Sequence, residues 1–141
     1  MPVVTLAGIT FNDGPDGDGD EFVVSDIEGW DSPGVEMIIV EKPLSDGAVI
    51  GHGRRASRSL GVAGYIIGET VADVARARRK LATAINGIVT ADGTLVVDEG
   101  DATYSLTVRL AAPMRTRQHT AQSVRFDLSL VAADPAKTLV P

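Results

Sequence analysis

The sequence predicts an α+β fold, a mainly antiparallel sheet or barrel-like sandwich crossed by one amphipathic helix. Two observations carry this prediction. Three segments after residue 93 alternate apolar and polar residues with a period of two, which is typical of strands with one buried face. Residues 70–88 place their apolar side chains at helical spacing instead. The length of 141 residues suits a single domain.

The N-terminal part reads as short strands separated by a polar loop. Residues 3–11 predict a strand pair or an interrupted strand, with a bend at Gly8. Residues 12–20 lack apolar side chains and are rich in Asp and Gly, so they predict a loop. Residues 22–27 predict a further strand.

The next segment surrounds the only tryptophan, Trp30. Because Trp is buried on average, we expect a partly buried, structural Trp30 within the turn-rich stretch 29–34. Residues 35–41 are mostly apolar and predict a strand that is buried over much of its length. Residues 43–55 predict a polar connection that contains a turn at Asp46-Gly47.

Residues 57–68 predict a strand whose period-two pattern places Leu60, Val62 and Ile66 on one face. Gly61 and Gly64 interrupt that strand. They indicate either a bulge or a close approach of another backbone.

Residues 70–86 predict the helix. Thr70 is suited to cap its N-terminus, and Asp73 completes a weak capping box. Gly87 is expected to end the helix in the left-handed conformation. Arg76, Arg79, Lys80 and Thr83 are expected on the wet face. The expected buried stripe is Val71, Val74, Leu81, Ile85 and Ile88.

Three strands are expected to follow, beginning near Leu95, Leu106 and Val124. The last two are long and two-sided, so we expect them to pair antiparallel. The connection between them, residues 113–122, is expected to be a basic loop.

Charge and composition exclude several classes of protein. No cysteine is present, so a disulfide framework and thiolate chemistry are excluded. No apolar run approaches the ~20 residues of a membrane span, and the N-terminus lacks signal-peptide features. We therefore expect a soluble protein made in the cytoplasm. Residues 1–50 hold eleven acidic residues and one basic residue, whereas residues 51–141 hold eight acidic and twelve basic residues. Such parts attract each other within or between chains.

The candidate chemistry is weak. Asp16, Asp18 and Asp20 have the alternate spacing of a calcium loop, but Glu21 and Ile27 stand where that loop needs Gly and Glu. A solvated or subunit-contact loop is therefore favoured over a calcium site. His52 and His119 lack neighbouring metal ligands. We expect no catalytic, cofactor-binding or metal residues, hence no cofactor and no enzyme activity.

In order along the chain, several segments resemble the N-terminal domain of siphophage distal tail proteins. They are Gly29-Trp30 with Pro33, the Asp46-Gly47 turn, the strand 60–67, the helix 71–88, the run from Asp92 to Val97, and the ending from Phe126 to Pro135. The ending, an alternating strand that runs into Ala-Asp-Pro, is the most specific. The resemblance implies a tail-tube-like domain over residues 1–135 and a short C-terminal tail at 136–141, with no second domain after Asp134-Pro135.

This resemblance implies a hexameric ring in the phage tail tip, between the major tail tube protein and the baseplate hub or tail-tip protein. In that family an extended hairpin reaches the neighbouring subunit, and we expect residues 12–28 or 43–58 to do so here. The loop 113–122 is expected to meet a neighbouring ring. Neither a membrane nor sequence-specific nucleic acid is expected as a partner. The expected subunit-interface residues are Asp16, Asp18, Asp20, Arg54, Arg55, Arg58, Arg115 and Arg117, and the expected structural residues are Trp30, Thr70, Gly87, Asp134 and Pro135.

Three alternatives stay open. A tube subunit or a tail terminator would share the same fold. A metal-dependent binding module would use the acidic loop 13–21. A nucleic-acid binder would use the basic helix face around Arg76, Arg78, Arg79 and Lys80, although no aromatic residues interleave there to stack bases.

Overall fold

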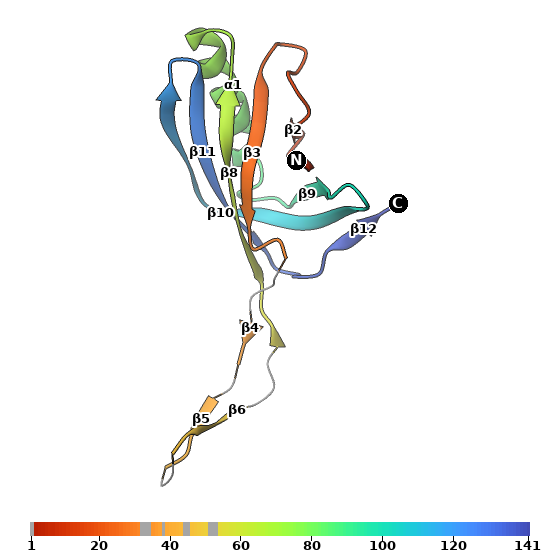
Figure 1. Ribbon diagram of the computed structural model, residues 1–141, viewed down its shortest axis with the longest axis vertical. Coiled ribbons are helices and arrows are strands. Elements are labelled where there is room, and N and C mark those ends of the chain that lie inside the picture. The colour runs from red at the N-terminus through yellow and green to blue at the C-terminus, as the bar shows by residue number, and fades with distance from the viewer. Residues whose placement is uncertain (1, 32–34, 38, 44–45, 51–53) are drawn as a thin grey trace.

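A bent antiparallel sheet with one helix against it forms the body of the molecule, and a thin arm projects from it (Figure 1). The computed structural model describes residues 2–31, 35–37, 39–43, 46–50 and 54–141. The predicted α+β class is confirmed. The strands of the body are β1 (Val3–Leu6), β2 (Ile9–Phe11), β3 (Glu21–Glu28), β8 (Arg58–Ile67), β9 (Gly93–Asp98), β10 (Thr103–Thr120), β11 (Ser123–Ala132) and β12 (Thr138–Val140).

The strand order is β2-β1-β9-β10-β11-β8-β3, with β12 added against the first residues of β10. β10 belongs to two layers, because Thr103–Val108 pair with β9 and the residues from Arg109 onward pair with β11. The register shifts on either side of Ala112, next to Pro113, which has no N–H to donate. This irregularity allows the strand to bend from one layer into the other.

The sheet does not close into a barrel, because β2 and β3 at its two ends form no strand ladder. Asn12 joins them instead. Its backbone N–H donates to the Phe22 carbonyl at 2.9 Å, and its Oδ1 accepts from the Val24 N–H at 3.0 Å. The predicted strand pair at residues 3–11 is confirmed, with Ala7 and Gly8 forming the turn at positive φ.

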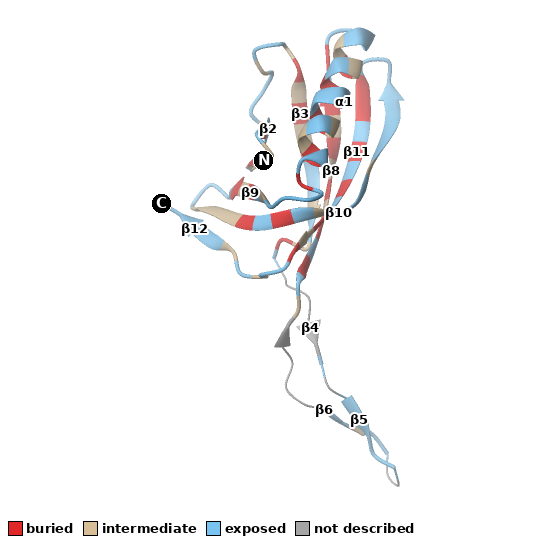
Figure 2. Ribbon diagram, turned by 180° about the vertical axis from the view of Figure 1, so that it is seen from behind, coloured by how far each residue is buried: buried red, intermediate tan, exposed pale blue. Residues whose placement is uncertain are grey.

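The helix α1 (Val71–Asn86) packs on β8, β10 and β11 and covers one face of the sheet (Figure 2). Thr70 caps it by accepting a hydrogen bond from the Asp73 N–H. Two details of the helix prediction are wrong. Val71 is exposed, and Ala77 is buried in the stripe with Val74, Leu81 and Ile85.

The predicted left-handed cap at Gly87 is also wrong, because Gly87 has φ −65° and ψ −21°. The N–H groups of Gly87, Ile88 and Val89 donate to carbonyls three residues back, at Ala84, Ile85 and Asn86. The helix therefore tightens into successive turns instead of reversing at a left-handed residue. This continuation brings Ile88 into the core, where it is buried as expected.

The predicted basic loop 113–122 is wrong in its bounds. β10 continues to Thr120 and β11 begins at Ser123, so only Ala121 and Gln122 connect them. The predicted antiparallel pairing of the two strands is confirmed. Apart from Pro113 and Met114, residues 113–120 are polar, which suggests a loop. The segment nevertheless pairs with β11, and all of it except the partly buried Met114 is exposed. A strand with solvent on both faces shows no alternation of apolar and polar residues, so periodicity does not predict it.

The arm leaves the body between β3 and β8. At its base β4 (Val35–Glu36) pairs with β7 (Arg54–Arg55), and further out β5 (Ile39–Glu41) pairs with β6 (Ala48–Ile50). The predicted buried strand at 35–41 is therefore wrong, since it is two short strands and β5 is wholly exposed. The expected polar connection at 43–55 contains the returning strands β6 and β7. A two-stranded ribbon has no second layer that would bury either face.

Candidate assembly surfaces

Arg58 holds the root of the arm to the end of the chain. It begins β8 on the same face as Leu60 and Val62, and it is only 4 % exposed. Its Nη1 donates to the carbonyls of Gly29 and Trp30, at 2.9 and 2.6 Å. Its Nε and Nη2 both donate to the Pro135 carbonyl, at 3.0 and 2.8 Å. The guanidinium thus joins the start of the arm to the residues that follow β11.

This placement corrects the expectation that Arg58 is a subunit-contact residue, because its side chain is buried and bonded within its own chain. The period-two pattern of β8 already indicated that Arg58 is buried. Arg58 lies two residues before Leu60, on the buried face, and a buried arginine requires hydrogen-bond acceptors nearby. Sequence reasoning missed this role because the acceptors are backbone carbonyls from distant segments.

Trp30 is the second part of the arm root and is 7 % exposed. Its indole N–H donates to Glu99 Oε1 at 2.7 Å. Lys137 lies over the indole ring, with its Nζ 4.6 Å from the ring centroid, and also approaches Tyr104 and Glu99. The turn between β9 and β10 and the segment after Pro135 are therefore fixed against the start of the arm. Asp134 contributes a local bond by accepting the Ala136 N–H at 3.0 Å.

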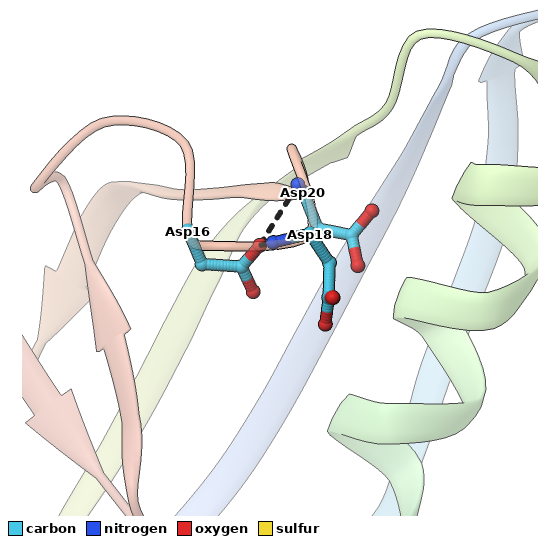
Figure 3. A group of neighbouring side chains, drawn as sticks. All are labelled: Asp16, Asp18 and Asp20. Carbon is cyan, nitrogen blue, oxygen red and sulfur yellow. Dashed lines mark hydrogen bonds between the residues drawn. The ribbon is translucent and has the colours of Figure 1, made fainter.

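The acidic loop brings Asp16, Asp18 and Asp20 together (Figure 3), with one carboxylate oxygen of each within 4.8 Å of the others. The loop is closed by Asp16, whose Oδ1 accepts the N–H groups of Asp18 and Asp20 at 2.9 and 3.0 Å. Gly14 and Gly19 supply the positive φ that the turns need.

Two cations of α1 bind this loop. Lys80 Nζ lies 2.9 Å from Asp16 Oδ2, and Arg76 Nη2 lies 2.9 Å from Asp20 Oδ1. Arg76 also pairs with Asp73 on its own helix. Partial burial by itself would raise the pKa of Asp16, but the hydrogen bonds from Lys80 and from the loop N–H groups outweigh it and lower that pKa. The hydrogen bond to Asp16 in turn raises the pKa of Lys80.

The loop therefore serves first as an anchor to the helix of the same chain. Asp20 is 1 % exposed, which corrects its expected role as a subunit contact. Among the described residues, its Oδ2 is a buried side-chain atom without a hydrogen-bond partner. The alternative of a metal-dependent module stays a prediction, and calcium titration by calorimetry tests it, since absence of both heat and a change in melting temperature would contradict it.

The remaining expected interface residues lie on β7 and β10. Arg115 and Arg117 are exposed on β10. Arg54 and Arg55 make up the strand β7, and His52 lies outside the described residues. His119 packs near Tyr65, with the ring centroids 5.1 Å apart. Among the described side chains, Arg115 and Arg117 form no ion pair with the acidic loop.

The far end of the arm, with β5 and β6, is largely exposed to solvent (Figure 2) and includes several apolar residues. Ile39 is 58 % exposed and its cross-strand partner Ile50 is 62 % exposed. Met37, Val40 and Val49 are also more than half exposed. Exposed apolar side chains gathered on one ribbon are typical of an interaction site.

The bent sheet, its single crossing helix and the projecting arm define a fold that is used by phage tail hub and baseplate proteins. The resemblance to distal tail proteins is confirmed at this level, by solved structures. The Dit protein of phage SPP1, from the hub of the adsorption apparatus of phages that infect Gram-positive bacteria, aligns over 97 % of this chain and 51 % of its own, with 18 % identity and a TM-score of 0.72.

A chain of the phage p2 baseplate, solved in its activated conformation with strontium, aligns over 92 % of this chain and 43 % of its own, with 8 % identity and a TM-score of 0.61. The chain thus spans about half the length of the solved proteins that it matches. No family model and no curated protein sequence matches it. Among the described residues, no helix combines the length and hydropathy that crossing a bilayer requires.

Proposed function

We propose that this chain is a structural virion protein, a distal tail adaptor of a long-tailed phage. Six copies form a ring that joins the tail tube to the baseplate hub or tail-tip protein. The fold shared with SPP1 Dit over 97 % of the chain supports this role. On this proposal the protein performs no catalysis, and it is located at the tail tip.

The single observation that carries the proposal is the arm. A two-stranded ribbon is marginally stable alone in water, and β5 and β6 expose four large apolar side chains, with Met37 exposed just before β5. Burying one such side chain contributes ~1.5–3 kcal/mol, so the ribbon is stabilised when another surface covers it. A neighbouring subunit supplies that surface in a ring, because each copy both extends an arm and receives one.

The arm root has the rigidity that this role requires. Arg58, Trp30 and the segment after Pro135 fix the two ends of the arm to the body. Fixing both ends of the arm limits the directions in which it can leave the body. This pre-organisation lowers the entropy cost of assembly.

Mass photometry and negative-stain microscopy of the full chain test the ring, with expected particles of six copies. Replacing Ile39 and Ile50 by Ser is expected to abolish the ring while leaving the melting temperature of the body unchanged. Replacing Val71 and Val89, which are exposed on and after α1, by Ser is the matched control and is expected to leave the ring intact. A chain that stays monomeric at high concentration, also when mixed with its tail neighbours, would contradict the proposal.

Copy number in the particle separates the adaptor from a tube subunit or a tail terminator, which would share the fold. Electron microscopy of particles with a labelled copy of this protein is expected to show one ring at the distal end. Label along the whole tail would instead identify a tube subunit. Label at the end of the tail next to the capsid would identify a terminator.

A further inference from the structure

The body has two open sheet edges that lie on opposite sides of one layer (Figure 1). β3 ends the strand order. Among the described residues β8 is its only strand partner, and Asn12 is hydrogen-bonded to its outer side at Phe22 and Val24. At the other side, β10 from Ala112 to Thr120 has β11 as its only strand partner among the described residues. Open edges invite pairing with another chain. Opposite edges meet in a head-to-tail contact, which generates a ring when the rotation closes.

The β10 edge is basic. Arg115 and Arg117 are exposed there, and Arg125 on β11 lies directly opposite Arg117. Like charges that face each other across two strands are destabilising. Among the described residues none of these three arginines forms an ion pair, and the only nearby carboxylate on the hairpin is Asp127, opposite Arg115. This surface is therefore suited to an anionic partner.

The β3 edge borders an acidic groove of about 690 Å³ at the arm root. It is lined by Trp30 and by apolar residues of β1, β3 and β9. None of the described residues that line it is a lysine or arginine, and Lys137 lies beside it, over Trp30 and 3.9 Å from Glu99. Asp26 and Asp98 form no ion pair among the described residues. The carboxylates that line the groove are Asp26, Asp31, Asp98 and Glu99.

We propose that the arginine edge of one copy, Arg115, Arg117 and Arg125, docks against the acidic groove of the next copy. The inference rests on the proposed ring and names one of its contacts. The charges are opposite, the surfaces belong to opposite edges of one layer, and guanidinium–carboxylate pairs add directional hydrogen bonds to the attraction. Such complementarity fixes the orientation of one partner on the other. The contact complements the arm, which bridges the same neighbours through apolar surface.

Charge reversal in the full chain tests this contact. The variant R117E/R125E makes the hairpin acidic, and the variant D26R/D98R makes the groove basic. Each variant alone is expected to need a roughly tenfold or higher protein concentration for half-assembly, because every head-to-tail contact now joins like charges. An equimolar mixture of the two is expected to assemble again, as a ring in which the two variants alternate.

The variant R78E/R79E makes the same change of charge on exposed residues of α1 and is expected to assemble as the wild-type chain does. Circular dichroism confirms that every variant is folded. R117E/R125E assembling like the control would overturn the contact while leaving the ring standing. The contact would also be overturned if the mixture of folded variants failed to assemble. It would be overturned as well if R117E/R125E formed an intact ring but lost binding to duplex DNA, because the arginines would then bind nucleic acid. A monomeric wild-type chain would remove the ring and this contact together.

Discussion

The guanidinium of Arg58 donates two hydrogen bonds to the carbonyl oxygen of Pro135, from Nε at 3.0 Å and from Nη2 at 2.8 Å. Pro135 follows the last long strand of the sheet, and Arg58 is where the returning arm re-enters it. The pair therefore connects the point where the arm returns to the body with the segment that leads from β11 to β12. Because Arg58 also bonds Gly29 and Trp30, one side chain determines how the arm departs.

Replacing Arg58 by Met is expected to lower the free energy of unfolding by ~2–4 kcal/mol, because buried carbonyls lose their donors while the volume of the side chain is largely kept. Urea unfolding followed by circular dichroism measures the change. Arg109→Met is the control, since Arg109 is exposed and pairs with the exposed Asp92, so its loss is expected to cost no more than ~0.5 kcal/mol. Equal stability of R58M and the wild-type chain would contradict the structural role of Arg58.

The hydrogen bond between Trp30 and Glu99 is expected to appear as a coupling in a double-mutant cycle. Trp30→Phe keeps most of the ring surface and removes the N–H, while Glu99→Gln removes the charge of the acceptor. Each is expected to destabilise the chain by ~1–2 kcal/mol, and the double variant by less than the sum. Urea unfolding of the four proteins measures this coupling. Strictly additive costs would show that the two side chains do not act together.

Gly64 allows β3 and β8 to approach each other. A Cβ at Gly64 would lie 1.8 Å from the Val23 carbonyl oxygen, which is backbone and cannot turn away. Gly64→Ala is therefore expected to destabilise the protein by ~3 kcal/mol or more. At Gly61 of the same strand an added Cβ meets only the Glu28 side chain, at 3.6 Å or more, so Gly61→Ala is expected to change the melting temperature little. Similar melting temperatures for the two variants would contradict this account.

The Asp16–Lys80 ion pair is expected to make stability depend on acid pH. The pKa of Asp16 is lowered below its ordinary value of 3.8 in the folded chain, so the unfolded chain takes up the proton first as the pH falls. The pair therefore contributes fully above that value, and the contribution is lost as the pH falls toward the folded pKa. The free energies of unfolding of wild type and Asp16→Asn are expected to differ near neutral pH and to converge as the pH falls below the folded pKa of Asp16. A difference that does not change with pH would rule this out.

Periodicity predicted the body well because its strands and helix each have one buried face. The alternation from Leu60 to Ile66 and the helical spacing from Val74 to Ile85 follow directly from the burial of one face. The arm and the outer half of β10 were mispredicted for the opposite reason. Both faces of Ile39–Glu41 and of residues 115–120 are exposed, so the pattern of their side chains carries no information about their pairing within the chain.

The candidate surfaces were likewise predictable only in part. The excess of acidic residues before residue 50 and of basic residues after it is visible in composition alone. Which charges are used within the chain is not visible, because Arg76 and Lys80 reach Asp20 and Asp16 across more than fifty positions. Arg58 was expected at a subunit surface for the same reason, although it lies in the interior.

The sequence by itself determined the fold class, the helix and its N-cap, the pairing of the last two long strands and the likeness to distal tail proteins, because each depends on local pattern and on which side chains must leave water. Only the tertiary structure decided that the strands β4 to β7 project as an arm, that Arg58 closes its root, and that basic and acidic surfaces lie on opposite sides of one layer. Those features depend on contacts between distant segments. Local pattern does not specify such contacts, since the free energy that forms them comes from partners the segment does not contain.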